Sequence, residues 1–280
     1  MGSAAHRLLR SAVACLLLAE AWSHFFWETP YRAALEAHPG VASWLGIEPE
    51  AGERVVLGFG IWFLLAGVVT VVWRPAWLGR SVAVLALLPA ALSFTARVAI
   101  SPDPWLVAVT QGWELCAILA LAISVERHRG PAQIPLQAGL AAAFGSWSLH
   151  AFGIGAETPA QWLTWIQAIW PGGGGDATHL RILAGLTLGA CFCIWIRALV
   201  PAAALILSLA GLAAVVTPVV AHLDSGAFEI LHRWIPAAVG RMGLVLLPVM
   251  MAVNGGSAPS PPAPRRLKRI DLPPEETELV

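Results

Sequence analysis

Long apolar runs, each about the length of a membrane-crossing helix, recur along most of the chain. A helix that rises about 1.5 Å per residue needs roughly 20 apolar residues to cross a hydrocarbon core of about 30 Å. Segments that meet this requirement cover residues 8–27, 55–73, 80–100, 105–125, 134–154, 179–199, 201–221 and 232–253. The pattern therefore predicts an all-α membrane protein with eight transmembrane helices.

The composition agrees with a protein that lies mainly in lipid. Only 12% of the residues are charged, whereas a soluble domain carries about 25%. This excludes a soluble enzyme and a disordered chain. The 17 basic residues balance the 17 acidic ones. The chain therefore lacks the excess of positive charge that would indicate a nucleic-acid partner. The expected partner is the lipid bilayer, and other subunits of a membrane complex stay open as further partners.

The basic residues indicate how the chain is oriented, because Lys and Arg accumulate in the cytoplasmic loops of membrane proteins. One side of the predicted bundle carries Arg7, Arg10, Arg74, Arg80, Arg127, Arg129, Arg197, Arg265, Arg266, Lys268 and Arg269. The other side carries only Arg32, Arg54, Arg181 and Arg233. We therefore expect both termini in the cytoplasm.

The chain also shows a weak internal repeat of four helices. The segment Ala21–Phe25 resembles Ser146–Phe152, and Glu28-Thr29-Pro30 recurs as Glu157-Thr158-Pro159. The predicted organisation is a first four-helix unit at 1–130, a second at 131–254 and a disordered cytoplasmic tail at 255–280. Residues 158–170 place their tryptophans on one helical face, which is typical of a helix lying in the outer interface. Such a helix would be either a membrane-anchoring belt or a lid over a site.

Ionisable groups within the predicted spans are the best guides to function, because they are costly in a bilayer and usually face the bundle interior. Glu20, His24 and Glu28 are spaced four apart and lie on one face of the first helix. His24 and His150 lie at matched depths in the two units. They are candidates for metal or haem ligation or for proton handling, and the alternative is a hydrogen bond to a neighbouring helix.

Two further charges lie near the predicted midplane on equivalent helices. Glu114 is about nine residues inside the fourth span, and Arg241 is about nine residues inside the eighth. An unpaired charge at this depth would be very costly. We therefore predict that Glu114 and Arg241 pair, directly or through Glu20; a substrate or proton path is the alternative.

Other polar residues gather toward the predicted outer face. This group comprises Arg97, His179, Arg181, His222, Asp224, Glu229, His232 and Arg233. Glu229 and Arg233 have the spacing of a helical ion pair. The crowding favours a site for an anionic or redox-active ligand in the outer half of the bundle, and the alternative is a layer that is merely solvated.

The segment His179-Leu180-Arg181-Ile182-Leu183-Ala184-Gly185, after a helix that contains a histidine, resembles the DoxX-like bacterial inner-membrane proteins. The resemblance implies four-helix units and a location in the bacterial inner membrane. Some members of that family are linked to quinone-coupled sulfur oxidation or redox complexes, and most have no known activity. It transfers no catalytic residue. The cofactor is not identified, and a quinone and a haem are the two candidates.

Three functions remain open at this point. The first is a redox-associated subunit that binds a quinone or another small ligand in the outer half of the bundle. The second is a proton-coupled small-molecule transporter, indicated by the repeat and by Glu114 and Arg241. The third is a structural or assembly subunit in which the buried polar groups only fix helix packing. The sequence does not decide whether the protein is an enzyme.

Overall fold

The computed structural model describes residues 3–26, 30–46, 51–72, 75–124, 133–152, 177–221, 223 and 226–255, and these contain helices but no strand. The all-α prediction is therefore confirmed for the described part of the chain. The predicted interfacial helix at 158–170 and the tail after Gly255 lie outside the described residues.

The helices follow one another along the chain in the order expected from the apolar runs. The first half contains α1 (Ser3–Phe26), α2 (Pro30–Ala37), α3 (Pro39–Leu45), α4 (Ala51–Val72), α5 (Ala76–Ile100) and α6 (Pro104–Ile123). The second half contains α7 (Gln133–Ala151), α9 (Ala177–Cys193), the short 3₁₀ turn η1 (Arg197–Leu199), α10 (Val200–Ala221), α11 (Ala227–Glu229), the π turn η2 (Ile230–Trp234), α12 (Ile235–Arg241) and α13 (Gly243–Gly255).

Six helices of the described residues are long and apolar enough to cross a membrane. They cover Ala4–Phe26, Arg54–Val72, Trp77–Ile100, Pro104–Ile123, Arg197–Val216 and Ala227–Asn254. The other two predicted spans also fold as helices. In α7 the polar residues Gln133, Gln137 and His150 lower the hydropathy, and the apolar part of α9 is the shorter stretch Leu180–Cys193. The multi-pass membrane character is thus confirmed with six candidate spans.

Helix boundaries follow local signals in the sequence. Asp103 caps α6, since its carboxylate accepts a hydrogen bond from the Leu106 N–H at 3.0 Å, and Pro104 occupies the first helical position. At the far end of α9, the carbonyl of Ile194 accepts a 2.8 Å hydrogen bond from the Gln137 side chain. This buried contact satisfies a carbonyl in the turn that follows α9 and fastens α7 to it.

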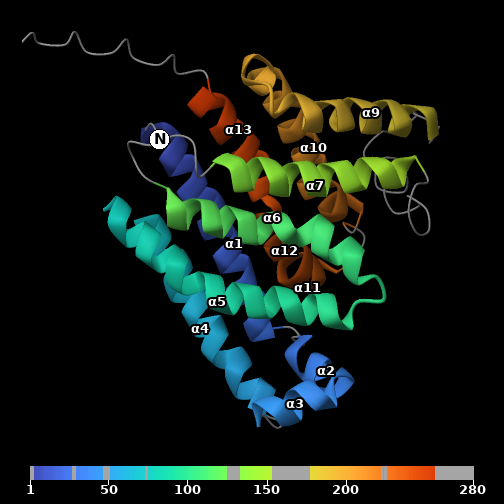
Figure 1. Ribbon diagram of the computed structural model, residues 1–280. Helices are drawn as coiled ribbons and strands as arrows, with labels where there is room; N and C mark the ends of the chain where they lie inside the picture. Colours follow the sequence, from blue (N-terminus) through green and yellow to red (C-terminus); the bar gives the residue numbers. More distant parts are fainter. Residues whose placement is uncertain are drawn as a thin grey trace, which may run out of the picture.

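The long helices form one bundle. In Figure 1, α5, α6, α7 and α9 lie side by side with alternating direction, while α1 and α13 cross behind them. The helix α1 packs against α4, α6, α12 and α13, which makes it central to the bundle. The short helix α2 packs against α4 and α5 at the end of the bundle reached by Phe26.

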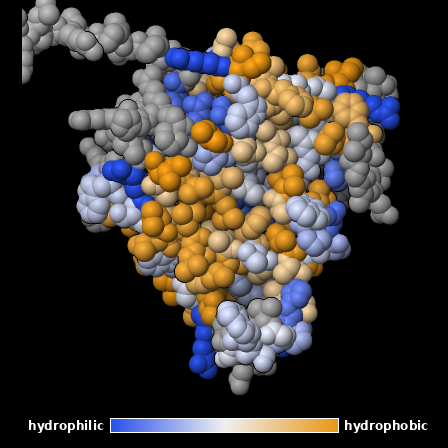
Figure 2. All heavy atoms as spheres, in the orientation of Figure 1, coloured by the Kyte–Doolittle hydropathy of each residue, from blue (hydrophilic) through white to orange (hydrophobic). Residues whose placement is uncertain are grey.

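The outer surface of the bundle is strongly apolar. Leu65 on α4 and Val84, Leu85 and Leu88 on α5 are each more than half exposed. Figure 2 shows hydrophobic residues over much of the middle of one face, with hydrophilic residues toward its margins. Such an extended patch on a soluble monomer would cause association. On this protein it fits contact with lipid.

Close packing at the centre depends on a small residue where α12 meets α13. A Cβ atom at Gly243 would lie 2.6 Å from the ring of Trp113, which is buried on α6. The absence of a side chain at position 243 therefore lets α13 approach the indole. Small residues have this role at many helix–helix contacts in membranes.

The last membrane helix is interrupted in two places. Pro236 has no N–H to give to the carbonyl four residues earlier, that of His232, and a π turn occupies Ile230–Trp234. The indole of Trp22 on α1 donates a 2.8 Å hydrogen bond to the His232 carbonyl. A second break at Met242 separates α12 from α13 and follows directly after Arg241. The interruptions thus lie on both sides of Arg241, the charged residue within the predicted span.

Candidate functional site

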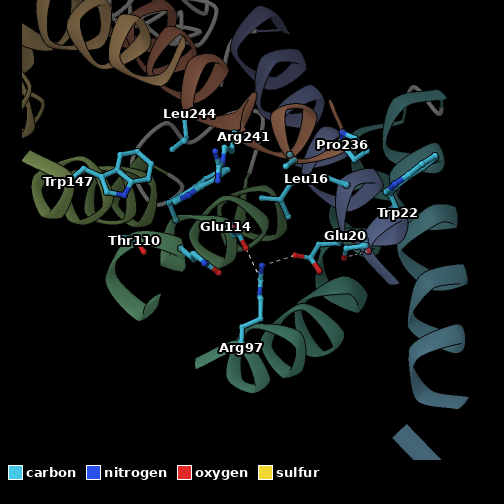
Figure 3. A pocket seen from close by; sticks show the side chains of 16 residues that line it. Leu16, Glu20, Trp22, Arg97, Thr110, Glu114, Trp147, Pro236, Arg241 and Leu244 are labelled. Atoms are coloured by element: carbon cyan, nitrogen blue, oxygen red, sulfur yellow. Dashed lines mark hydrogen bonds and ion pairs between the residues drawn. The ribbon is translucent and has the colours of Figure 1, made fainter. Parts of the chain in front are cut away.

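A polar cavity of about 390 Å³ lies inside the bundle, between α1, α5, α6, α7, α12 and α13 (Figure 3). It is lined by Leu16, Ala19, Glu20, Trp22, Ser23, Arg97, Thr110, Gln111, Trp113, Glu114, Trp147, Pro236, Ala237, Gly240, Arg241 and Leu244. Four of these side chains carry formal charge: Glu20, Arg97, Glu114 and Arg241. Two carboxylates and two guanidinium groups make the formal charges of the wall cancel.

Arg97 on α5 extends into the cavity and joins two carboxylates from different helices (Figure 3). Its Nη1 lies 3.1 Å from Oε1 of Glu20 on α1, and its Nη2 lies 2.7 Å from Oε2 of Glu114 on α6. The side chains are 28%, 12% and 19% exposed, respectively. The charge-assisted hydrogen bond to Glu114 and the ion pair with Glu20, in a poorly solvated site, hold α1, α5 and α6 together.

Glu20 has further partners, which fix its orientation. The hydroxyl of Ser93, one turn before Arg97 on α5, donates to Oε2 of Glu20 at 3.2 Å. The same carboxylate oxygen lies 3.8 Å from Nδ1 of His24 on the next turn of α1. Both oxygens of Glu20 are therefore engaged, one by Arg97 and the other by Ser93.

His24 connects this cluster to α2. Burial raises the pKa of Tyr31 on α2 to about 12, so its hydroxyl keeps its proton at neutral pH. The hydroxyl lies 3.0 Å from Nε2 of His24, and Nδ1 of His24 donates to the Glu20 carbonyl at 2.7 Å. A neutral imidazole satisfies both bonds when Nδ1 carries the proton, since a carbonyl can only accept. The ring also packs against Phe63 of α4, with ring centroids 5.1 Å apart.

Arg241 enters the cavity from the side opposite Arg97 (Figure 3). Its Nη1 lies 3.4 Å from the carbonyl of Ala214 on α10, a long hydrogen bond. Pro218 follows four residues later and has no N–H to give to that carbonyl. The guanidinium group has other N–H donors, and no protein acceptor for them is found among the described residues.

Two polar atoms of the cavity wall are buried without a hydrogen-bond partner in the described part of the chain. They are Nε of Arg97, which is a donor, and Oε1 of Gln111, which is an acceptor. Buried polar groups are nearly always satisfied by protein or by a bound molecule. Both atoms, however, have almost no exposed surface, so they lie behind the surface of the cavity and do not face the space inside it.

The structure corrects the ion pair predicted from depth. Glu114 and Arg241 line the same cavity but form no ion pair, and the partner of Glu114 is Arg97. Arg97, which was expected in the outer polar layer, extends its long side chain to Glu20 and Glu114 in the bundle. The predicted link to Glu20 exists, but it joins Glu20 to Glu114 through Arg97.

The predicted histidine pair is not formed. His150 on α7 makes a 3.2 Å hydrogen bond between its Nδ1 and the Ser146 carbonyl, and it does not contact His24. Both ring nitrogens of His24 have protein partners, so this residue gives the haem hypothesis no support. Among the described residues, no group of three or more His, Cys, Asp or Glu side chains could hold a metal ion.

The other candidates lie away from the cavity or outside the described residues. Arg181 is exposed on α9. Glu229 and Arg233 form the helical ion pair predicted from their spacing, at 3.7 Å and on the exposed surface. Glu28 and His222 lie outside the described residues. Of the predicted site residues, the structure thus brings together Glu20, Arg97, Glu114 and Arg241, with His24 behind Glu20.

Several residues of the site were not predicted from the sequence. Thr110, Gln111 and Trp113 share α6 with Glu114, and Trp147 reaches the cavity from α7. The helical spacing between Gln111 and Glu114 was an available signal, because positions three apart lie on one face. Nothing in the sequence pattern indicated that Trp147 would complete the wall.

No protein-family model, curated protein or solved structure matches this chain.

Proposed function

We propose that this multi-pass membrane protein binds the head group of a quinone in the polar cavity, as a redox-associated membrane subunit. The observation that carries the proposal is a cavity of about 390 Å³ within an apolar bundle. The charges of the cavity wall balance, and the guanidinium groups of Arg97 and Arg241 extend into the cavity as hydrogen-bond donors. A neutral ring with carbonyl oxygens is compatible with such a wall, because it brings no further charge into the bilayer. The resemblance to DoxX-like proteins points to the same ligand class.

The chemistry of the wall supports this ligand. The guanidinium groups of Arg97 and Arg241 enter from opposite sides and can donate to acceptor oxygens at the two ends of a planar ring. Trp22, Trp113 and Trp147 also line the cavity and provide apolar, stacking surfaces. In this arrangement Arg241 binds the head group directly, while Glu20 and Glu114 hold Arg97 in position.

The proposal predicts that Arg241→Gln weakens quinone binding about 10- to 100-fold. The reason is that a hydrogen bond to a charged group contributes about 1.5–3 kcal/mol, and each 1.4 kcal/mol is about tenfold in affinity. Binding is measured by titrating the purified protein with a short-chain quinone and following the quenching of tryptophan fluorescence. Arg181→Gln is the matched control, because Arg181 is exposed on α9. The affinity of this variant for the quinone should equal that of the unmodified protein.

Equal affinities for the unmodified protein and Arg241→Gln would contradict the assignment of Arg241. A lack of any saturable quenching by the unmodified protein would contradict quinone binding as a whole. Analysis of the lipids extracted with the purified protein gives an independent check, since a quinone-binding subunit is expected to carry quinone through purification.

A proton-coupled transporter is the second candidate function. It is favoured by the interrupted helix that lines the cavity, where the π turn, Pro236 and the break at Met242 flank Arg241. Broken helices next to a buried charge are a recurring feature of transporter sites. A protein that shows no quinone binding and moves a solute into liposomes under a pH gradient would favour this candidate.

We also propose an architecture that goes beyond the six candidate spans. It has eight spans, arranged as two four-helix units related by a pseudo-twofold axis, with α1, α4, α5 and α6 corresponding to α7, α9, α10 and α13. The packing supports this correspondence: the contacts α1–α4, α5–α6, α4–α5 and α1–α13 match α7–α9, α10–α13, α9–α10 and α7–α6. Three contacts within the first unit thus have counterparts in the second, and the first helix of each unit contacts the last helix of the other.

This architecture, in the bacterial inner membrane with both termini cytoplasmic, predicts which loops are accessible from outside. In a variant without its four native cysteines, a membrane-impermeant thiol reagent added to whole spheroplasts should label Gly173→Cys and spare Ser257→Cys. Both should react after the membrane is permeabilised. Labelling of Ser257→Cys alone in intact spheroplasts would reverse the orientation.

A further inference from the structure

A second cavity of about 270 Å³ lies between α7, α9 and α10, beside the polar one. It is lined by Phe144, Trp147, Ser148, Ala151, Leu180, Leu183, Ala184, Leu186, Thr187, Ile206, Leu209, Ala210 and Ala213. We call it the apolar groove. Leu183, Leu186 and Leu209 are each more than half exposed on the outer surface of the bundle, so the groove is bordered by side chains that face the lipid.

The two hydroxyl groups of the apolar groove already donate hydrogen bonds within the protein. Ser148 donates to the Phe144 carbonyl and Thr187 donates to the Leu183 carbonyl, each at 2.8 Å within its own helix. The remaining side chains are hydrocarbon or aromatic. The groove therefore suits a hydrocarbon chain better than a polar group.

Trp147 belongs to the lining of both spaces. It is the residue by which α7 reaches the polar cavity, on the side of that cavity away from Trp22 (Figure 3). The polar cavity and the apolar groove thus meet at this residue. A molecule that passes this side chain would have its polar end among the charged groups and its apolar end between α7, α9 and α10.

We propose that the apolar groove holds the hydrocarbon tail of the ligand whose head lies in the polar cavity, so that the ligand is a single-tailed membrane amphiphile. The inference rests on the proposed head-group site. Transfer of a tail from lipid into the groove brings little hydrophobic gain, because lipid chains are as apolar as the groove. Occupancy by this tail rather than by bulk lipid therefore depends on the head group, which holds the tail at high effective concentration.

The test uses a benzoquinone with a decyl tail that carries a diazirine at its end. The full-length protein in lipid nanodiscs is illuminated with this probe, digested, and analysed by mass spectrometry. We expect modification within the α9 segment 180–187 and the α10 segment 206–213. An excess of the unlabelled decyl quinone should remove it, and Arg241→Gln should reduce it about 10-fold or more, in line with the lost charged hydrogen bond.

A variant that fills the groove separates tail binding from head binding. Ala210→Phe should remove most of the labelling in both segments, while a quinone without a tail still quenches tryptophan fluorescence with unchanged affinity. Ala202→Phe is the matched control, since Ala202 is exposed on the same helix and lies outside the groove, and it should label normally. Ala213→Phe, at the other end of the α10 lining, serves if Ala210→Phe does not fold.

Different outcomes overturn different steps. Labelling that spreads over α4 and α5, or that an excess of unlabelled quinone does not remove, would mean that ordinary lipid covers the groove, and the tail site would be rejected. Normal labelling in both groove-filling variants would reject it as well. Failure of the tail-free quinone to bind the unmodified protein would instead reject the head-group site, and the inference with it.

Discussion

Replacing Arg97 by glutamine is expected to destabilise the protein by about 3–5 kcal/mol, the usual cost of removing one partner from a buried charge cluster. In Arg97→Gln the carboxylates of Glu20 and Glu114 lose the guanidinium group that lies 3.1 Å and 2.7 Å from them. Two like charges then remain in a poorly solvated cavity with no cation between them. The loss is measured by unfolding the protein with sodium dodecyl sulfate in mixed micelles.

The matched control is Arg32→Gln, which also breaks an Arg–Glu pair. Arg32 Nε lies 2.8 Å from Glu36 Oε1, but both side chains are more than half exposed. Exposed pairs contribute only about 0–1 kcal/mol, so this variant should unfold almost like the unmodified protein. A similar small loss in Arg97→Gln would show that water screens the three charges and that the cluster does not stabilise the bundle.

A triple variant tests whether the loss comes from the unpaired carboxylates. Combining Arg97→Met with Glu20→Gln and Glu114→Gln removes all three charges together, and such replacements are often neutral for stability. We expect this variant to regain most of the stability lost in Arg97→Gln. Continued instability would mean that Arg97 acts through packing and not through charge.

Replacing Gly211 by alanine is the second change with a large expected effect, a loss of about 1–3 kcal/mol typical of overpacking in a well-packed core. A Cβ atom at this position of α10 would lie 2.5 Å from the backbone oxygen of Leu244 on α13. That neighbour is backbone and cannot rotate away, so α13 must shift as a whole. Because Leu244 and Arg241 line the cavity, the variant should also weaken quinone binding.

Gly189→Ala on α9 is the control for this change. Apart from its chain neighbours and the backbone of its own helix, no atom lies within 4 Å of a Cβ built at Gly189. Alanine is favoured over glycine inside a helix by about 1 kcal/mol. The control should therefore unfold no earlier than the unmodified protein in the same detergent titration. Equal stability of Gly211→Ala and Gly189→Ala would show that α10 and α13 separate easily, contrary to their close approach.

The sequence predicted the helical membrane character and the positions of the long helices. Long apolar runs have few stable structures in lipid, since only a helix satisfies the backbone within one segment. For this reason helices occupy all eight predicted ranges, and six of them have the length and hydropathy of a span. The breaks in the last helix were not predicted, because they depend on Trp22 and other neighbours as well as on Pro236.

The sequence also indicated which charges matter, because a charge far inside an apolar run must find a partner whatever the details of packing. Glu20, Glu114 and Arg241 were selected on this ground, and all three line one cavity. Depth along the helix, however, gives only one of the two coordinates that pairing requires. The other is the rotation of each helix about its axis, which depends on its neighbours.

The tertiary structure alone decided the pairing around the cavity. Packing of α5 against α6 directs Arg97 between Glu20 and Glu114, whereas Arg241 contacts the Ala214 carbonyl on α10. A long, flexible arginine side chain also reaches well beyond its own helical turn. Residue depth could be predicted from the sequence because it depends on local spacing, but the choice of partner depends on contacts between helices far apart in the chain.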